Sequence, residues 1–353
     1  MNKRIVIIGA GLSGLVTAHL LKKQGFSSVK ILEANARIGG RIYTKKIGFS
    51  PIELGATWLW KYNTQLLKLC KEFGIELFEQ KMDGEALFEA MSMNPVQRFQ
   101  LPPNQEISYR IVGGTAQLIN KISSSLSSET IQLNEKVELI EHKGSENCII
   151  IRTTKNTYQA DIVISTIPPK LLLHSIRFIP ELDNELKEIA KKTHTWMRDS
   201  IKFSVVFKTP FWRKQGSSGV AFSNVGPFTE LYDHSSANDK GYALMGFINN
   251  SLNSLNTEQR KQKVLEQLTK FFNDFSSEFI SYEEKVWKEE VLLTVKDNQF
   301  IVPHQNNGHP IFQKNYYQGK LFISGSETST EYGGYMEGAV RSAFNTVNKI
   351  KNI

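Results

Sequence analysis

The chain has 353 residues, more than a single hydrophobic core usually supports, so we expect two domains. Its residues are 40% hydrophobic and 22% charged, which is ordinary for a folded soluble protein. The net charge of +8 comes from lysines scattered along the chain rather than from a basic block, which argues against nucleic acid as a partner.

The cysteine content and the apolar runs indicate in which cellular compartment the protein is found. Cys70 and Cys148 form neither a disulfide framework nor a metal-site spacing, so we expect no bound metal and a cytoplasmic protein. Lys3 and Arg4 precede an apolar run as in a signal peptide, but glycines interrupt the run and no small-residue cleavage site follows. No apolar stretch is long enough to cross a bilayer, so we expect no membrane contact.

The first 33 residues have the pattern of a βαβ unit. Residues 4–8 form a short apolar run rich in β-branched side chains, which is typical of a parallel strand buried on both faces. The segment Gly9-Ala10-Gly11-Leu12-Ser13-Gly14 follows, and apolar residues then recur at helical spacing as far as Gln24-Gly25. A second strand over residues 29–32 leads directly into Glu33.

Each part of this unit suits an adenine dinucleotide. Gly9 permits a tight turn, Gly11 lets the backbone approach a pyrophosphate, and Gly14 lets the helix pack closely on the strand. The N-terminus of the helix offers unpaired N–H groups to the phosphates. Glu33, about twenty residues further on, is placed to accept the ribose hydroxyls.

The residues after Glu33 favour FAD over NAD. Residues 33–41 match the extension found in flavoproteins that resemble glutathione reductase. In those proteins the glycine pair that matches Gly39 and Gly40 runs past the phosphates and ribityl chain of the flavin. Arginines such as Arg37 and Arg41 neutralise phosphate charge there.

Several later segments resemble the flavin-containing amine oxidases, and the resemblance covers nearly the whole chain. The matching segments are residues 53–58, 160–169, 208–214, 282–287, 321–328 and 334–339. The resemblance implies an α/β fold of the glutathione-reductase-2 type, in which a Rossmann-like FAD-binding domain carries an inserted α+β, mixed-sheet substrate domain. We expect residues 1–79, 113–191 and 290–353 in the FAD-binding domain, and residues 80–112 and 192–289 in the substrate domain.

The βαβ unit and the resemblance together give a set of expected cofactor-binding residues. These are Gly9, Gly11, Ser13, Gly14, Glu33, Arg37, Gly39, Gly40, Arg41, Gly55, Ala56, Thr57, Val137, Trp287, Gly325, Ser326, Glu327, Tyr335 and Met336. The backbone of Val137 is expected to bond the adenine, whereas Ser326, Glu327 and the backbone around Met336 are expected to hold the ribityl chain and the pyrimidine edge.

Lys202 and Tyr335 carry the catalytic prediction. In the amine oxidases the lysine that matches Lys202 holds a water at flavin N5, although alternation along residues 199–207 equally allows Lys202 to point to solvent on a half-buried strand. Tyr335 matches one wall of the aromatic cage that guides an amine to the flavin. The alternative is that Tyr335 is a core tyrosine whose hydroxyl forms a hydrogen bond with a buried partner.

The chain departs from the family at three places. No cysteine follows Trp287 where some relatives attach flavin covalently, so we expect non-covalent FAD. Asp297 stands where the second aromatic cage wall is expected, and Phe300 could replace that wall. Three residues, Trp58, Asp297 and Phe300, are expected to contact the substrate. The segment between Gln80 and Gly113, which builds much of the substrate cavity in the monoamine oxidases, is much shorter here.

The resemblance implies oxidation of an amine to an imine, with hydride transfer to flavin N5. Water then hydrolyses the imine to an aldehyde or ketone, and O2 reoxidises the flavin to give H2O2. The expected partners are therefore a small-molecule amine and O2, and the oligomeric state stays open. Two alternatives also stay open: an FAD-dependent dehydrogenase or desaturase acting on a C–C bond, and a flavin-binding protein without turnover.

Overall fold

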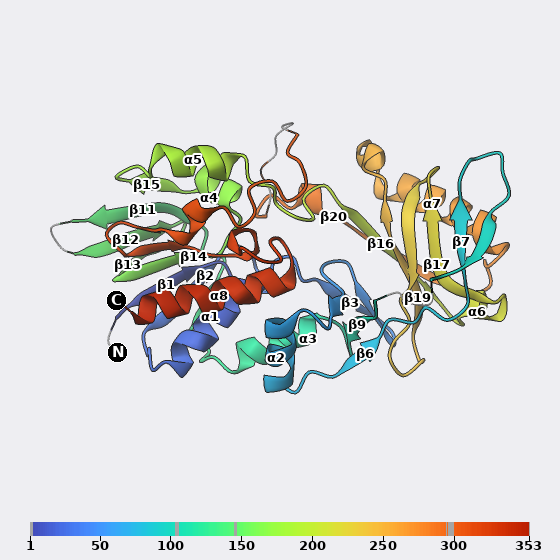
Figure 1. Ribbon diagram of the computed structural model, residues 1–353, viewed down its shortest axis with the longest axis horizontal. Coiled ribbons are helices and arrows are strands. Elements are labelled where there is room, and N and C mark those ends of the chain that lie inside the picture. Colours follow the sequence, from blue (N-terminus) through green and yellow to red (C-terminus); the bar gives the residue numbers. More distant parts are fainter. Residues whose placement is uncertain (1–2, 103–105, 145–146, 294, 296–299, 353) are drawn as a thin grey trace.

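The computed structural model describes residues 3–102, 106–144, 147–293, 295 and 300–352. Figure 1 shows an elongated molecule with one sheet system near the two termini and a second sheet at the opposite end. Helices α1 (Leu12–Lys23) and α8 (Met336–Lys351) lie side by side across the first system.

The first system is built on a six-stranded sheet in the order β10-β2-β1-β14-β22-β21. The strands are β1 (Ile5–Ile8), β2 (Val29–Glu33), β10 (Ile131–Leu133), β14 (Ile162–Ser165), β21 (Asn315–Tyr316) and β22 (Leu321–Ile323). All pairs are parallel except β21 with β22. Loops that leave the carboxyl ends of parallel strands meet at one sheet edge, which is where such folds bind ligands.

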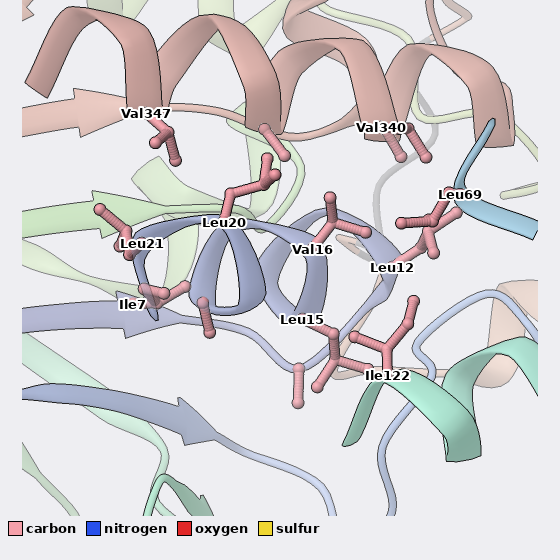
Figure 2. Packing of buried hydrophobic residues seen from close by; sticks show 14 of the residues in the cluster. Ile7, Leu12, Leu15, Val16, Leu20, Leu21, Leu69, Ile122, Val340 and Val347 are labelled. Carbon is pink, nitrogen blue, oxygen red and sulfur yellow. The ribbon is translucent and has the colours of Figure 1, made fainter. Parts of the chain in front are cut away.

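Both faces of this sheet are covered, which explains why its strands are continuous apolar runs. On one face pack α1, α8, α2 (Thr64–Glu72) and α3 (Ala116–Ser124). In Figure 2, Val16 and Leu20 of α1 point toward Val340 and Val347 of α8, whereas Leu15 points toward α3.

A smaller mixed sheet and two helices pack on the other face of the six-stranded sheet. The sheet has the order β13-β12-β11-β15, with β11 (Val137–Lys143), β12 (Cys148–Thr153), β13 (Thr157–Ala160) and β15 (Arg177–Ile179). The helices are α4 (Pro169–Ser175) and α5 (Asn184–Lys191).

The second system is a seven-stranded mixed sheet in the order β20-β16-β19-β18-β17-β7-β8. Its strands are β7 (Glu85–Glu89), β8 (Gln97–Gln100), β16 (Ile201–Phe207), β17 (Ser217–Ser223), β18 (Phe228–Asp233), β19 (Tyr242–Ile248) and β20 (Phe279–Val286). Only the β7–β17 pair among them is parallel. The short segment after Gln80 thus supplies the last two strands at one end of this sheet, β7 and the edge strand β8.

Strand β16 corrects the expectation of a half-buried strand, because all seven of its residues are buried. Phe203 and Val205 pack with α7 (Thr257–Phe272) on one face of the sheet. Val206 packs with Ile52 on the opposite face. Residues that alternate along a strand face opposite sides, so Lys202 lies on the face turned toward the first system.

Shorter elements complete the fold. They are the hairpin β3 (Thr44–Ile47) and β4 (Ser50–Glu53), the sheet β5-β9-β6 (Leu59–Trp60, Ser108–Ile111 and Leu77–Glu79), the single-turn helix α6 (Phe211–Lys214), and the 3₁₀ turns η1 (Asn250–Ser254), η2 (Trp287–Glu289), η3 (Pro310–Gln313) and η4 (Ser326–Thr328). No helix in the described ranges has the length and apolar character that a membrane crossing requires.

The starts of two helices are defined by the residues that precede them. Helix α7 is capped by Asn256 rather than by Thr257, because the Asn256 side chain accepts from the N–H of Gln259 and the Gln259 side chain accepts from the N–H of Asn256. This reciprocal pair is a capping box, formed here with asparagine. Helix α8 begins at Met336, directly after its N-cap residue Tyr335.

Candidate active site

A cavity of about 1140 Å³ runs between the carboxyl edge of the six-stranded sheet and the inner face of the seven-stranded sheet. It brings together most of the residues that the sequence singled out. Those lining it are Gly9, Gly11, Ser13, Glu33, Arg37, Gly39, Gly40, Arg41, Gly55, Ala56, Thr57, Trp58, Val137, Lys202, Ser326, Tyr335 and Met336.

The glycines at the start of α1 show how this end of the cavity suits a dinucleotide. A Cβ on Gly14 would lie 2.0 Å from the carbonyl oxygen of Gly9, so only glycine permits this helix–strand contact. A Cβ on Gly11 would meet nothing within 4 Å and would project into open space. No side chain caps α1, and its first-turn N–H groups can therefore serve an anion in the cavity.

Glu33 lies at the same edge, at the end of β2. Its carboxylate accepts from the N–H groups of Ala10 at 2.7 Å and Asn35 at 2.8 Å. Burial raises the pKa of Glu33, and these two hydrogen bonds oppose the shift. A carboxylate has about four acceptor positions, so the side chain still has positions for ribose hydroxyls.

An ion pair connects the Gly39-Gly40-Arg41 turn to the C-terminal segment. The Arg41 guanidinium contacts the Glu327 carboxylate at 2.5 and 3.0 Å and donates to Ser326 Oγ at 2.7 Å. Burial opposes the charged form of Glu327, but the charge and hydrogen bonds of Arg41, together with hydrogen bonds from Ser326 and the backbone, hold the pKa of Glu327 below its usual range. Glu327 does not line the cavity; it orients Arg41, which does.

A second helix begins at the cavity. The N-cap of α8 is Tyr335, no side chain caps this helix, and Tyr335 and Met336 both line the cavity. Gly325 has a φ of +110° and turns the chain from β22 into η4. Two helix N-termini thus open onto one cavity, an arrangement that suits a cofactor that carries negative charge, such as phosphates.

Lys202 is buried, with 1% of its surface exposed, so the solvent-facing alternative is wrong. Its ammonium donates to the carbonyl oxygen of Gly55 at 2.7 Å and to the hydroxyl of Thr57. It also lies 5.1 Å from the Trp58 ring centroid and 5.4 Å from that of Phe247. Burial lowers the pKa of Lys202 to about 7, and Glu53 partly opposes this shift.

Further buried ionisable groups lie behind this lysine. The Glu53 carboxylate accepts from the N–H of Thr115 at 2.5 Å and from Thr44 Oγ1 at 2.9 Å. Burial raises the pKa of Glu53. His234 Nε2 accepts from the N–H of Glu53 at 3.0 Å, and burial lowers the pKa of His234. These hydrogen bonds tie the end of β4 to β3, to the start of α3 and to the segment that follows β18.

Tyr335 borders an aromatic cluster rather than a simple two-wall cage. Its ring lies 5.4 Å from that of Trp196 and 5.2 Å from that of His304, and its hydroxyl is 3.3 Å from His304 Nε2. Trp196 also lines the cavity. Asp297 lies outside the described residues. Phe300 is 85% exposed and does not line the cavity, so the structure does not bring it to the site.

Trp287 lies one layer behind the cavity. Its buried indole N–H donates to the carbonyl oxygen of Leu54 at 2.8 Å and so supports the segment that leads to Gly55. Contact between Trp287 and a cofactor stays a prediction.

Sequence reasoning missed several residues that line the cavity, among them Trp196, Glu230, Phe247, Tyr62 and Tyr332. The rings of Trp60, Tyr62 and Tyr332 are stacked in series at 5.8 and 5.5 Å where the cavity meets the surface. Glu230 and Phe247 belong to neighbouring strands, and only their alternation along β18 and β19 could have placed them on a common face. In the described part of the chain, no group of three or more His, Cys, Asp or Glu side chains could hold a metal ion.

Residues 92–351 match the family described as flavin containing amine oxidoreductase, and residues 7–73 match the NAD(P)-binding Rossmann-like domain. The chain is 25% identical to a probable flavin-containing monoamine oxidase A of Dictyostelium discoideum, over 99% of this chain and 97% of that protein. It is 24% identical to the flavin-containing amine oxidase A of Sus scrofa, over 99% and 85% respectively.

Two solved structures share the fold with a TM-score of 0.85. One is a putrescine oxidase bound to putrescine, 21% identical, with 100% of both chains covered. The other is a cyclohexylamine oxidase from Brevibacterium oxydans IH-35A, 20% identical, covering 100% of this chain and 99% of that one. These two likenesses establish the fold.

Proposed function

The chain belongs to the flavin-containing amine oxidoreductase family and is an FAD-dependent oxidoreductase, and from this premise we propose that it oxidises a small amine to an imine. Water hydrolyses the imine to an aldehyde or ketone. The amine gives up two electrons and two protons, and O2 takes them up as H2O2. FAD, when bound, supplies the electron transfer between the two substrates.

The cofactor is proposed to lie along the cavity, with its pyrophosphate at the N-terminus of α1. Gly9 and Gly11 admit it closely, Glu33 binds the ribose, and Arg41 offsets phosphate charge. Non-covalent attachment is supported by the sequence, because residues 288–300 contain no cysteine. Cys70 and Cys148 are both buried, and neither lines the cavity.

The observation that carries the proposal is the buried ammonium of Lys202. It lies on the cavity between the rings of Trp58 and Phe247 and is hydrogen-bonded to Gly55 and Thr57. A lysine with a pKa near 7 can exchange a proton at neutral pH, as a general acid or base requires. Lys202 therefore has the position and the protonation equilibrium to handle a proton while Trp58, Phe247 and Tyr335 orient the amine.

The test is anaerobic mixing of the flavin-loaded protein with primary, secondary and di-amines while the visible absorbance of the flavin is followed. Bleaching by at least one amine, with matching H2O2 release once O2 is admitted, is the expected result. If the protein carries FAD and no amine bleaches it, amine oxidation is the wrong assignment, although the flavin assignment stands.

A further inference from the structure

One carboxylate on the substrate side of the cavity has no task in the proposed reaction. Glu230, on β18, is partly buried and lines the cavity beside Phe247. Its Oε2 accepts a hydrogen bond from the Tyr232 hydroxyl at 2.9 Å. Among the described residues, no lysine or arginine forms an ion pair with it.

The other acidic residues that line the cavity are satisfied by the protein itself. Glu33 accepts two backbone N–H groups, as described above. Glu135 accepts from Thr153 and Asn156. Glu337 accepts from the N–H groups of Gln65 and Leu66 and pairs with Arg341. Glu230 differs from all three, because among the described residues its hydrogen-bond partner is a single neutral hydroxyl.

The sheet register places Glu230 in line with Lys202. Lys202 on β16 is paired with Phe247 on β19, and Phe247 is paired with Glu230 on β18. Residues directly opposite in neighbouring strands point to the same face. The three side chains therefore form one row across the face that borders the cavity. Two strand spacings separate the backbones of Lys202 and Glu230, about 10 Å.

Aromatic rings occupy the space between the two ends of this row. Phe247 lies in the row itself, and Trp58 packs against Tyr232 at 5.0 Å and against Phe247 at 6.5 Å. The Tyr232 hydroxyl fixes the Glu230 carboxylate from the adjoining position on the same strand face. The row thus has an apolar middle, suited to methylene groups, and a negative charge at its far end.

We propose that Glu230 receives the distal ammonium of a diamine or polyamine whose other amino group is oxidised beside Lys202. A partly buried carboxylate without a cation is costly, and a cationic substrate group would offset that cost. The inference rests on the proposed function and names the substrate class for the same site. Glu230 determines specificity; it does not take part in the bond changes.

The test compares putrescine with pentylamine, which has a methyl group in place of the second amino group. In the flavin-loaded protein we expect putrescine to have the higher kcat/KM. In Glu230→Gln, kcat/KM for putrescine should fall roughly 10- to 100-fold, the range for a hydrogen bond between charged groups. The value for pentylamine should change little.

The matched control is Glu266→Gln, which neutralises an exposed carboxylate on α7 and should leave both substrates unaffected. Flavin content and the melting temperature of each variant report whether it folds. Tyr232→Phe keeps the ring against Trp58 but removes the hydroxyl, and it should lower the preference for putrescine by roughly 2- to 10-fold.

The outcomes separate the two proposals. If pentylamine reduces the flavin as efficiently as putrescine, or if Glu230→Gln leaves their ratio unchanged, the inference about Glu230 is wrong and amine oxidation stands. If neither these nor other amines reduce the flavin, both proposals fail.

Discussion

The edge of the six-stranded sheet and the inner face of the seven-stranded sheet border the same cavity but are built in different ways. The first presents mainly backbone: glycines, helix N-termini and turns that follow parallel strands. The second presents side chains from three neighbouring antiparallel strands, Lys202, Phe247 and Glu230. A cofactor common to many proteins can be held by backbone geometry, whereas the choice of substrate depends on individual side chains.

The two regions also treat charge differently. Near the six-stranded sheet, Glu327 is paired with Arg41 and Glu33 is bonded by backbone N–H groups. On the seven-stranded sheet, Lys202 is buried among aromatic rings, and in the described part of the chain Glu230 has only a hydroxyl partner. Substitutions in the first region should therefore affect folding and flavin content, and substitutions in the second should affect reactivity and specificity.

Gly14→Ala should have the largest effect. The new Cβ would lie 2.0 Å from the Gly9 carbonyl oxygen, so α1 must move away from β1. We expect a loss of about 3 kcal/mol in the free energy of unfolding and little bound flavin, measured by urea denaturation and absorbance. In Gly11→Ala the Cβ meets open space, so stability without flavin should be kept while flavin affinity falls. A Gly14→Ala protein with normal flavin content would contradict this account.

Lys202→Met should leave flavin content near normal and slow flavin reduction by an amine roughly 100-fold, the lower range for loss of a proton-transfer group. Stopped-flow absorbance measures this rate. The matched control is Lys285→Met, because Lys285 pairs directly with Lys202 across the sheet but does not line the cavity. Equal rates in Lys202→Met and in the unaltered protein would remove the catalytic assignment.

The same lysine should give stability a distinctive pH dependence. Burial lowers the pKa of Lys202 to about 7 from an ordinary value of 10.5. Between these pH values the unfolded chain holds a proton that the folded chain releases, so the free energy of unfolding rises with pH, by up to about 1.4 kcal/mol per pH unit. Urea denaturation of flavin-stripped protein across this range should show the rise. Lys202→Met should lack this rise. If the free energy of unfolding depends on pH in the same way in both proteins, Lys202 does not titrate as a buried group.

Asn256→Ala should have a small effect, because Asn256 caps α7 on the side of the seven-stranded sheet remote from Lys202. Loss of the cap should cost about 1 kcal/mol and leave amine turnover unchanged. Thr257→Ala should cost less, since the Thr257 hydroxyl donates to Glu284 instead of capping the helix. A larger loss for Thr257→Ala would show that the cap is misassigned.

The sequence allowed much of the cofactor side to be predicted and less of the substrate side. The β1–α1–β2 unit follows from a contiguous pattern of apolar runs, glycines and Glu33, and the structure has these elements within about a residue of the expected bounds. Strand β16 was expected to be half-buried, because alternation does not reveal that a second layer covers the polar face. Glu230 was missed because nothing in residues 228–233 distinguishes an acid facing a cavity from an acid facing water.

The sequence by itself therefore determined that this protein has a dinucleotide-binding βαβ unit and a chain of the flavin amine oxidase family, since local spacing dictates turns and helix starts. Only the tertiary structure decided that Lys202 is buried on the cavity and that Glu230 stands in one row with it. These facts depend on which strands pair and in which register, and on which face another layer covers. Such relations join residues far apart in the chain, so no local pattern contains them.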